Sequence, residues 1–224
     1  MIPEMSTDLR HARAHAYENP RPDVQALVPA GARRILDLGC SSGAVGAALK
    51  ARQRAEVVGL EIDASYAADA AARLDRVIHA DLEAFGDLDG LGTFDCLVAA
   101  DVLEHLRDPW AVLARFAALL EPGGTAVVSL PNVRYWETFW QVGWKGTFPR
   151  RHEGIFDATH LRWFTLWDAY ELLRHAGLEP VTVSRQMRFT PRGTRYDRHA
   201  ARLERTPLRP FLTFQHVIAA RRGG

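Results

Sequence analysis

The chain has 224 residues, which is enough for one domain with a sizeable hydrophobic core. Its composition, 25% charged and 47% hydrophobic, is that of a globular protein, and a formal net charge of +1 provides no field that would recruit nucleic acid. Cys40 and Cys96 lack the spacing of a metal site or a disulfide framework. No apolar run approaches the ~18 residues of a transmembrane segment, and Met1–Glu4 does not begin a signal peptide, so we expect a cytoplasmic protein.

Strand and helix patterns then alternate along the chain. Residues 1–30 are polar and spaced by prolines, which predicts helix and loop packed on the single domain formed by residues 31–224. Five runs are continuously apolar, as strands covered on both faces should be: residues 34–38, 55–61, 76–80, 94–99 and 125–130. With helical patterns between them, they predict an α/β fold with a doubly wound, mostly parallel, Rossmann-like sheet.

Capping residues mark the ends of the later helices. Asp108–Pro109 predicts a helix start before the fifth strand, and Leu120–Gly124 is expected to end that helix. Thr165–Asp168 resembles a capping box, which opens a helix that ends at Gly177. An Arg- and Pro-rich stretch, expected to be a loop, separates two closing strands that bring the predicted sheet to seven: residues 178–187 and 211–220.

The turn after the first strand is the most informative motif. A strand runs through Asp37 into the small-residue turn Gly39–Gly43 and then into a helix pattern, as at a nucleotide-binding corner. The dinucleotide fingerprint fails because Ser41 and Ala44 stand where it requires glycine. A carboxylate at Asp37 would also repel a pyrophosphate on the helix N-terminus. The motif therefore favours a cofactor with a cationic end and no phosphates, such as S-adenosylmethionine, over a nicotinamide dinucleotide.

With these elements the chain resembles the class I S-adenosylmethionine-dependent methyltransferases, over residues 33–183 and the last strand. Ser41 replaces the glycine usual in that family, and we expect the loop to tolerate it. Four motifs at successive strand ends carry the resemblance: Asp37-Leu38-Gly39-Cys40-Ser41-Ser42-Gly43, Glu61-Ile62-Asp63, His79-Ala80-Asp81-Leu82-Glu83, and Asp101-Val102-Leu103-Glu104-His105-Leu106 with Leu120–Gly124 after it. The resemblance implies a seven-stranded sheet with an antiparallel last strand, S-adenosylmethionine as cofactor and S-adenosylhomocysteine as product.

The resemblance also implies a cofactor site at the carboxyl edge of the sheet. Glu61 would accept hydrogen bonds from the ribose hydroxyls, and Asp81 from the adenine amino group, with Leu82 against the ring. Asp63 is either a further acid of the site or the N-cap of the next helix, and Asp37 could satisfy loop amides as well as the cofactor. No metal is expected. The predicted cofactor-binding residues are Tyr17, Asp37, Gly39, Cys40, Ser41, Gly43, Glu61, Ile62, Asp81, Leu82, Asp101 and His105.

Methyl transfer from a sulfonium requires in-line placement of the acceptor and, for some acceptors, a base. The candidate bases are His105, His152 and His160, with Asp157 and Glu153 as partners. We predict a catalytic set of His160, His105 and Asp157, in which His105 faces the methionine end of the cofactor. Structural roles are the alternative: His105 would pack at a helix start, and His160 would orient a loop.

Aromatic residues concentrate in residues 135–167, which hold ten of the chain's Phe, Trp and Tyr residues. Trp136, Trp140 and Trp144 recur at a spacing that places them on one helix face. This pattern predicts an aromatic-rich lid insertion at about residues 131–165 over the acceptor pocket. Packing on the core, a homodimer surface and a membrane-interface patch are the alternatives.

Two segments narrow the resemblance, Ser129–Trp136 and Asp157–Thr165, which are similar to a bacterial subgroup that includes ubiquinone-type and MetW-type proteins. We expect an O- or N-methyltransferase that acts on a hydroxyl or amine of a small molecule, such as a sugar or a natural-product intermediate. The alternative is a MetW-like cofactor-binding regulatory partner of a biosynthetic enzyme. Residues 1–30 are expected to pack over the cofactor site, with Tyr17 in contact with it.

Overall fold

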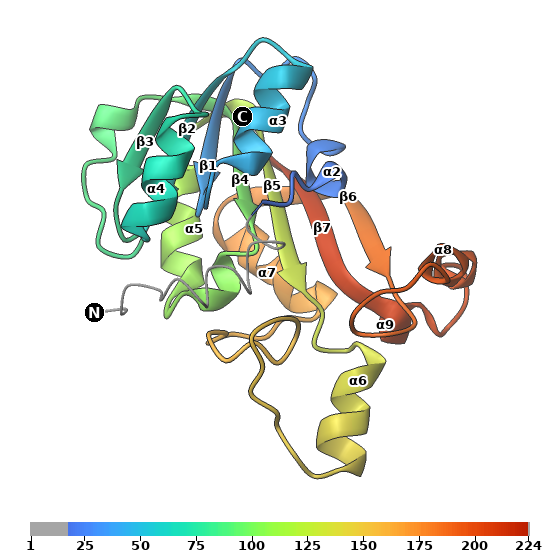
Figure 1. The fold of residues 1–224 in the computed structure, drawn as a ribbon. Coiled ribbons are helices and arrows are strands. Elements are labelled where there is room, and N and C mark those ends of the chain that lie inside the picture. Colours follow the sequence, from blue (N-terminus) through green and yellow to red (C-terminus); the bar gives the residue numbers. More distant parts are fainter. Residues whose placement is uncertain (1–17, 224) are drawn as a thin grey trace.

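The computed structural model describes residues 18–223. Seven strands form one sheet in the order β3-β2-β1-β4-β5-β7-β6, with the last strand of the chain antiparallel to both of its neighbours (Figure 1). The predicted seven-stranded, mostly parallel sheet is therefore confirmed. The strands are β1 Arg34–Leu38, β2 Glu56–Glu61, β3 Arg76–His79, β4 Phe94–Ala100, β5 Leu120–Pro131, β6 Leu178–Met187 and β7 Thr213–Arg222.

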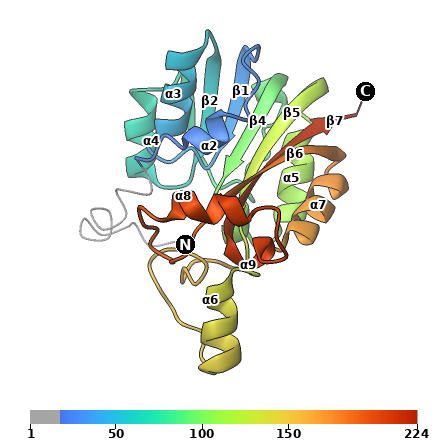
Figure 2. The same cartoon turned by 90° about the vertical axis from the view of Figure 1, so that its right-hand side faces the viewer.

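Helices cover both faces of the sheet, with α2, α3 and α4 on one side and α5 and α7 on the other (Figure 2). Alternate residues of each central strand supply two separate cores: in β1, Ile35 packs with the α3 side, whereas Leu36 packs with the α5 side. This two-sided burial explains why the strand sequences are continuously apolar. The helices are α2 Pro22–Gln25, α3 Ala44–Arg52, α4 Ala64–Ala71, α5 Pro109–Ala117, α6 Trp136–Thr138, α7 Leu166–His175, α8 Asp197–Ala200 and α9 Arg209–Leu212, with short turns η1 Asp89–Leu91, η2 Leu103–His105 and η4 Ala201–Leu203.

Most of the predicted caps are confirmed, and one helix end is wrong. Asp108 caps α5, and Thr165 forms the complete capping box of α7 with Asp168. However, α5 ends at Ala117, and Leu120–Gly124 belongs to β5. Leu120 pairs with Phe94, and the ladder is irregular between Phe94 and Cys96, so the Pro-Gly-Gly run is an irregular strand start and not a helix end.

The closing region also departs from the sequence prediction. The Arg- and Pro-rich stretch contains α8, η4 and α9 where a loop was expected. The last strand begins at Thr213 and not at residue 211, because Pro210 stands in the first turn of α9, where its missing N–H costs no helical hydrogen bond.

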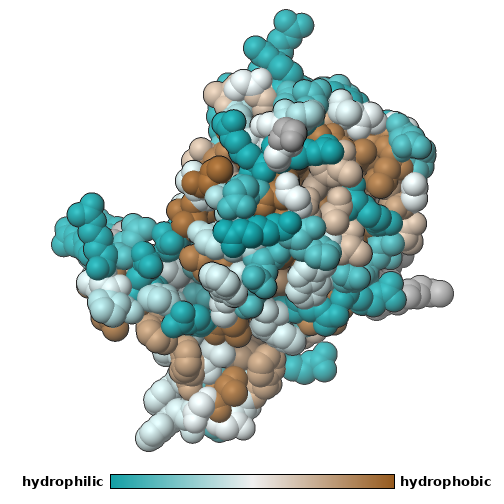
Figure 3. Space-filling model, turned by 180° about the vertical axis from the view of Figure 1, so that it is seen from behind, coloured by the Kyte–Doolittle hydropathy of each residue, from teal (hydrophilic) through white to brown (hydrophobic). Residues whose placement is uncertain are grey.

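The aromatic segment projects from the lower end of the molecule in Figures 1 and 2. It continues from α6 into a π-helix, η3 Phe139–Trp144, in which the rings of Trp140 and Trp144 stack 6.1 Å apart. Trp144 is 78% exposed, and residues at this end of Figure 3 are pale or brown. Packing on the core is therefore wrong for Trp144, whereas the lid, the homodimer surface and the membrane-interface patch stay predictions.

Candidate functional site

The strand order reverses between β1 and β4, so the loops after these two strands border the crevice of a doubly wound sheet. The loop after β1 has left-handed backbone at Gly39, Ser41 and Gly43. Gly39 also allows close packing, because a Cβ there would lie 2.6 Å from Val102 Cγ2. Ser41 adopts a conformation that favours glycine, and its N–H donates to Glu61 Oε2 at 2.8 Å.

Asp37 places an unsatisfied carboxylate beneath this loop. Its side chain is buried, with the residue 3% exposed, and its Oδ2 has no hydrogen-bond partner among the described residues. Burial, and then the charge of Glu61, raise the pKa of Asp37 to about 7. A cationic donor beside Oδ2 would satisfy the atom and favour its charged form. Asp37 therefore fits a cofactor that carries an ammonium group.

Glu61 and Asp63 organise the loop after β2. Glu61 accepts backbone hydrogen bonds from Ser41 and Asp63, and each carboxylate oxygen keeps a further lone pair for a ligand. Burial raises the pKa of Glu61. Asp63 is the N-cap of α4, since its Oδ1 accepts from Ser65 N at 2.9 Å and from Tyr66 N at 3.1 Å. The capping alternative is thus the one that the structure adopts for Asp63.

The loop after β3 holds the residues predicted to contact adenine. Asp81 is half-buried, and its Oδ1 accepts from Glu83 N at 2.8 Å. Leu82 is buried in the core on the α5 side. Ile62, which follows β2, is exposed, and buried Cys40 has its thiol pKa raised by burial. Tyr17 lies outside the described residues.

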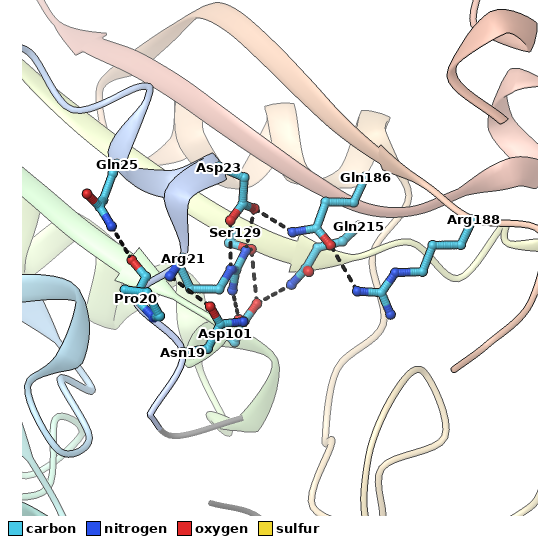
Figure 4. A network of polar contacts seen from close by, with 10 residues as sticks. All are labelled: Asn19, Pro20, Arg21, Asp23, Gln25, Asp101, Ser129, Gln186, Arg188 and Gln215. Atoms are coloured by element: carbon cyan, nitrogen blue, oxygen red, sulfur yellow. Dashed lines mark hydrogen bonds and ion pairs between the residues drawn. The ribbon is translucent and has the colours of Figure 1, made fainter. Parts of the chain in front are cut away.

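Asp101, which follows β4 in a left-handed conformation, is the centre of a polar network (Figure 4). It accepts from the Arg21 guanidinium, from Ser129 Oγ at 2.9 Å, and from the Gln215 amide. Arg21 is buried and also pairs with Asp23 at 2.9 Å. Through this network Arg21, which directly precedes α2, is linked to the end of β4, to β5 and to β7. The local sequence around Arg21 offers Asp23 but does not indicate the network, because Asp101, Ser129 and Gln215 are distant in the chain.

A second cluster follows on the turn η2, where Glu104 and His105 meet His160. The rings of His105 and His160 are 4.8 Å apart, and one ligand atom from each of the three residues lies within 4.8 Å of the others. Glu104 is 2% exposed, and within the described part of the chain its Oε2 accepts no hydrogen bond. Burial, and then the charge of Asp101, raise the pKa of Glu104 well above its ordinary value.

Backbone carbonyls orient both histidines of this cluster. His105 Nδ1 lies 3.2 Å from Thr159 O, and His160 Nδ1 lies 3.3 Å from Ile155 O. A carbonyl only accepts, so these contacts assign the proton of each neutral ring to Nδ1 and the lone pair to Nε2. Thr159 Oγ1 lies 3.1 Å from the same His105 nitrogen and donates to Asp157 Oδ1 at 2.6 Å.

The structure brings His105, His160 and Asp157 into one region, whereas His152 and Glu153 are exposed and outside the cluster. Glu104 was missed as a site residue, although it lies in one of the quoted motifs. Its adjacency to His105 was the available signal. The predicted roles of all these residues stay predictions.

The structure also shows a cavity away from this crevice, and its helices can be compared with the length that a membrane span requires. A cavity of about 330 Å³ lies at the opposite edge of the sheet, lined by residues at the amino ends of β1, β2 and β3 such as Arg33, Glu56 and Asp75. Over residues 18–223, no helix is both long enough and apolar enough to cross a membrane.

Known proteins resemble the chain in sequence and in fold. The family described as "Methyltransferase domain" matches residues 9–183. A ubiquinone biosynthesis O-methyltransferase of Cereibacter sphaeroides is 32% identical over 173 residues, which cover 71% of this chain and 65% of that relative. The chain thus matches slightly less than two thirds of that relative's length.

Solved structures share the fold at low sequence identity. A structure from Thermotoga maritima, described as a possible histamine N-methyltransferase, has a TM-score of 0.65 and 18% identity, covering 96% of this chain and 92% of that one. Magnesium protoporphyrin IX methyltransferase from Synechocystis, solved with bound S-adenosylmethionine, has a TM-score of 0.57 and 15% identity, covering 98% and 86%.

Proposed function

Since the chain belongs to the class I S-adenosylmethionine-dependent methyltransferases, we propose that it methylates a hydroxyl group of a small molecule. The observation that carries the proposal is the cluster of Glu104, His105 and His160 at the carboxyl end of β4. The O-methyltransferase named above supports oxygen as the acceptor atom. Natural-product and sugar hydroxyls are the acceptor classes that the proposal includes.

S-adenosylmethionine is the cofactor, and it supplies a methyl group already activated on a sulfonium. We assign Asp37, whose Oδ2 lies buried without a donor in the described structure, to the cationic methionine end. Glu61 would accept from the ribose hydroxyls, and Asp81 from the adenine amino group. Glu61 and Asp81 keep lone pairs beyond their present backbone bonds, and Asp37 has an Oδ2 without a donor among the described residues, so the three sites fit the cofactor.

His105 is assigned the role of general base. Its Nδ1 contacts the carbonyl and the hydroxyl of Thr159, which places the ring proton on Nδ1, so Nε2 is the nitrogen that would accept the proton of the acceptor hydroxyl. Asp157 holds the Thr159 hydroxyl, so it orients the ring through Thr159 without contacting the reacting atoms. When His105 takes up the proton, the charge of the imidazolium would favour ionisation of the neighbouring Glu104, whose carboxylate would then stabilise it.

A divalent cation is a second candidate occupant of the same cluster, because both imidazoles carry their lone pairs on Nε2 and Glu104 adds a carboxylate. There the ion would lower the pKa of the acceptor hydroxyl directly. Turnover after removal of divalent ions with EDTA distinguishes the two roles. Full activity supports the base, whereas loss and recovery with Mg²⁺ or Zn²⁺ supports the ion.

The test of the proposal is turnover on a panel of acceptors. The protein is incubated with S-adenosylmethionine and phenols, sugars and amines, and products with one added methyl group are identified by mass spectrometry. Methylation of a hydroxyl compound supports the proposal. Methylation of amines alone would overturn the oxygen assignment. Cofactor binding without turnover on any acceptor favours a MetW-like regulatory partner, for which co-purification with a biosynthetic enzyme is the next measurement.

A further inference from the structure

A smaller cavity, of about 140 Å³, lies where the segment 131–165 leaves and rejoins the domain. Arg134 and Asn132 line it from the end of β5, Arg185 from β6, His216 from β7, Arg209 from α9, and the first residues of α7 complete the wall. Asn132 Nδ2 donates to the carbonyls of Pro210 and Thr213, each at 2.8 Å, which holds α9 against the cavity.

The pairing of β7 with β5 and β6 determines how two of the lining side chains, His216 and Arg185, lie in the wall of this cavity. His216 pairs with Leu130 on one side and with Arg185 on the other, so the His216 and Arg185 side chains project from the same face of the sheet. Val133 N donates to Phe164 O at 2.9 Å, which joins the two ends of the segment beside the cavity. The wall therefore combines residues from five parts of the chain.

The charges around the cavity are mostly positive. Three arginines line it, and the carboxylate of Glu204 lies 3.3 Å from Arg185 at an exposed position. Asp168 at the start of α7 is already bonded to the N–H and hydroxyl of Thr165 in the capping box. Positive charge thus exceeds negative charge here, and the amino end of a ten-residue helix adds to the positive potential.

His216 supplies a buried polar atom inside this cationic wall. The residue is 4% exposed, and its Nδ1 has no hydrogen-bond partner in the structure from residue 18 to 223. Burial, and then the cations Arg185 and Arg209, lower the pKa of His216 to about 4. Both guanidinium groups therefore disfavour protonation of the His216 ring. The neutral ring can present an N–H donor from Nδ1.

We propose that this cavity binds an oxyanion of the phosphate class. Arginine forks match the geometry of phosphate oxygens, and a donor at His216 Nδ1 would satisfy the buried nitrogen. A volume of about 140 Å³ provides room for one phosphate group. A bound anion would hold both ends of the segment 131–165, and the site does not depend on the proposed methyl transfer.

Calorimetric titration with inorganic phosphate, at ionic strength held constant with sodium chloride, tests the site. We expect saturable binding by the wild-type protein and a rise in its Tm. Arg185→Gln and Arg209→Gln should each weaken the affinity about tenfold or more, because each removes a charge-assisted donor pair. Arg205→Gln, an exposed arginine outside the cavity, is the matched control and should leave phosphate affinity unchanged.

Two further measurements identify the source of the anion and check that the variants are folded. Glycerol 3-phosphate binding as tightly as inorganic phosphate, with glycerol inactive, indicates a phosphate carried on a larger molecule; preference for inorganic phosphate indicates the free ion. The thermal shift with S-adenosylmethionine should be equal in all variants, which shows that each folds. Absence of saturable phosphate binding by the wild type, or equal weakening in Arg205→Gln, would overturn the proposal whether or not methyl transfer is found.

Discussion

The carboxylates Asp37 and Asp101 lie at the ends of the neighbouring strands β1 and β4, and the fold surrounds them very differently. Asp37 is buried, and across the described residues nothing donates to its Oδ2. Asp101 accepts from the side chains of Arg21, Ser129 and Gln215. Three residues further on, Glu104 again has an Oε2 that no described residue satisfies. Two unsatisfied acids thus border one that is fully engaged.

This difference distinguishes carboxylates that can bind a ligand from carboxylates that stabilise the fold. An unsatisfied buried carboxylate destabilises the ligand-free protein, so its presence beside a crevice favours a role in binding a ligand or substrate. A carboxylate surrounded by donors stabilises the fold and has little capacity left for a ligand. By this criterion we propose that Asp37 and Glu104 take part in ligand binding and chemistry, whereas Asp101 holds the structure of the crevice between them.

The largest effect is expected at the proposed base. His105→Ala should reduce kcat about 10²- to 10⁴-fold, as for the loss of a general base, with a smaller effect on cofactor affinity. Steady-state kinetics with an acceptor from the panel measure it. His152→Ala, an exposed histidine outside the cluster, is the control and should keep wild-type turnover. Wild-type turnover in both variants would remove His105 from the mechanism.

Asp101→Ala tests whether Asp101 stabilises the fold. Removing this partner leaves the buried Arg21 guanidinium with Asp23 and the Ser129 hydroxyl as its side-chain partners. We expect a loss of about 2–3 kcal/mol in the free energy of unfolding, less than for a fully buried pair because Asp23 remains and the Asp101 side chain is 39% exposed. Urea denaturation measures it, and exposed Glu171→Ala is the control. Unchanged stability with strongly weakened cofactor binding would reverse the comparison.

Asp37→Asn tests whether Asp37 binds the cofactor. We expect it to lower the cofactor affinity and to raise the stability of the ligand-free protein. Cofactor affinity should fall by about 1–3 kcal/mol, because a charged acceptor is lost. The ligand-free protein should become more stable at alkaline pH. The pKa of Asp37 is raised from 3.8 unfolded to about 7 folded, so its contribution favours folding below pH 3.8 and is lost as the pH rises through about 7.

Thermal unfolding without ligand, at about pH 5 and about pH 8, measures the second effect of Asp37→Asn. The stability gain of the variant over the wild type should grow between the two pH values. A gain that is equal at both would show that the charge of Asp37 is satisfied in the ligand-free protein, and the comparison with Asp101 would then fail.

The smallest effect is expected at the start of α7. Thr165→Ala removes the capping box of α7, in the wall of the 140 Å³ cavity, and should cost about 1 kcal/mol of unfolding free energy. Cofactor affinity, measured by calorimetry, should be unchanged because the hydrogen bonds that the structure gives the Thr165 side chain are made with Asp168. A matching loss of cofactor affinity would show that helix stability and ligand binding are coupled across the site.

Much of the fold could be predicted because its signals are local. Continuous apolar runs predicted the strands, and the acids and hydroxyls before α5 and α7 predicted their caps. The prediction failed where long-range pairing overrides local chemistry. Leu120–Gly124 reads as a helix end from its glycines, but Leu120 is drawn into β5 by its pairing with Phe94. Likewise, helical spacing of tryptophans does not distinguish an α-helix from the π-helix that follows α6.

The sequence by itself determined the strand-turn-helix corner at Asp37, the succession of acids at the strand ends, and hence the family and its cofactor, since these depend on residues close together in the chain. Only the tertiary structure decided which polar groups are satisfied. Arg21 reaches Asp101, His105 meets His160, and Arg185 lies beside His216 through contacts between distant segments. Desolvation and hydrogen bonding depend on what surrounds a group in space, and that surrounding is set by the packing of the whole chain.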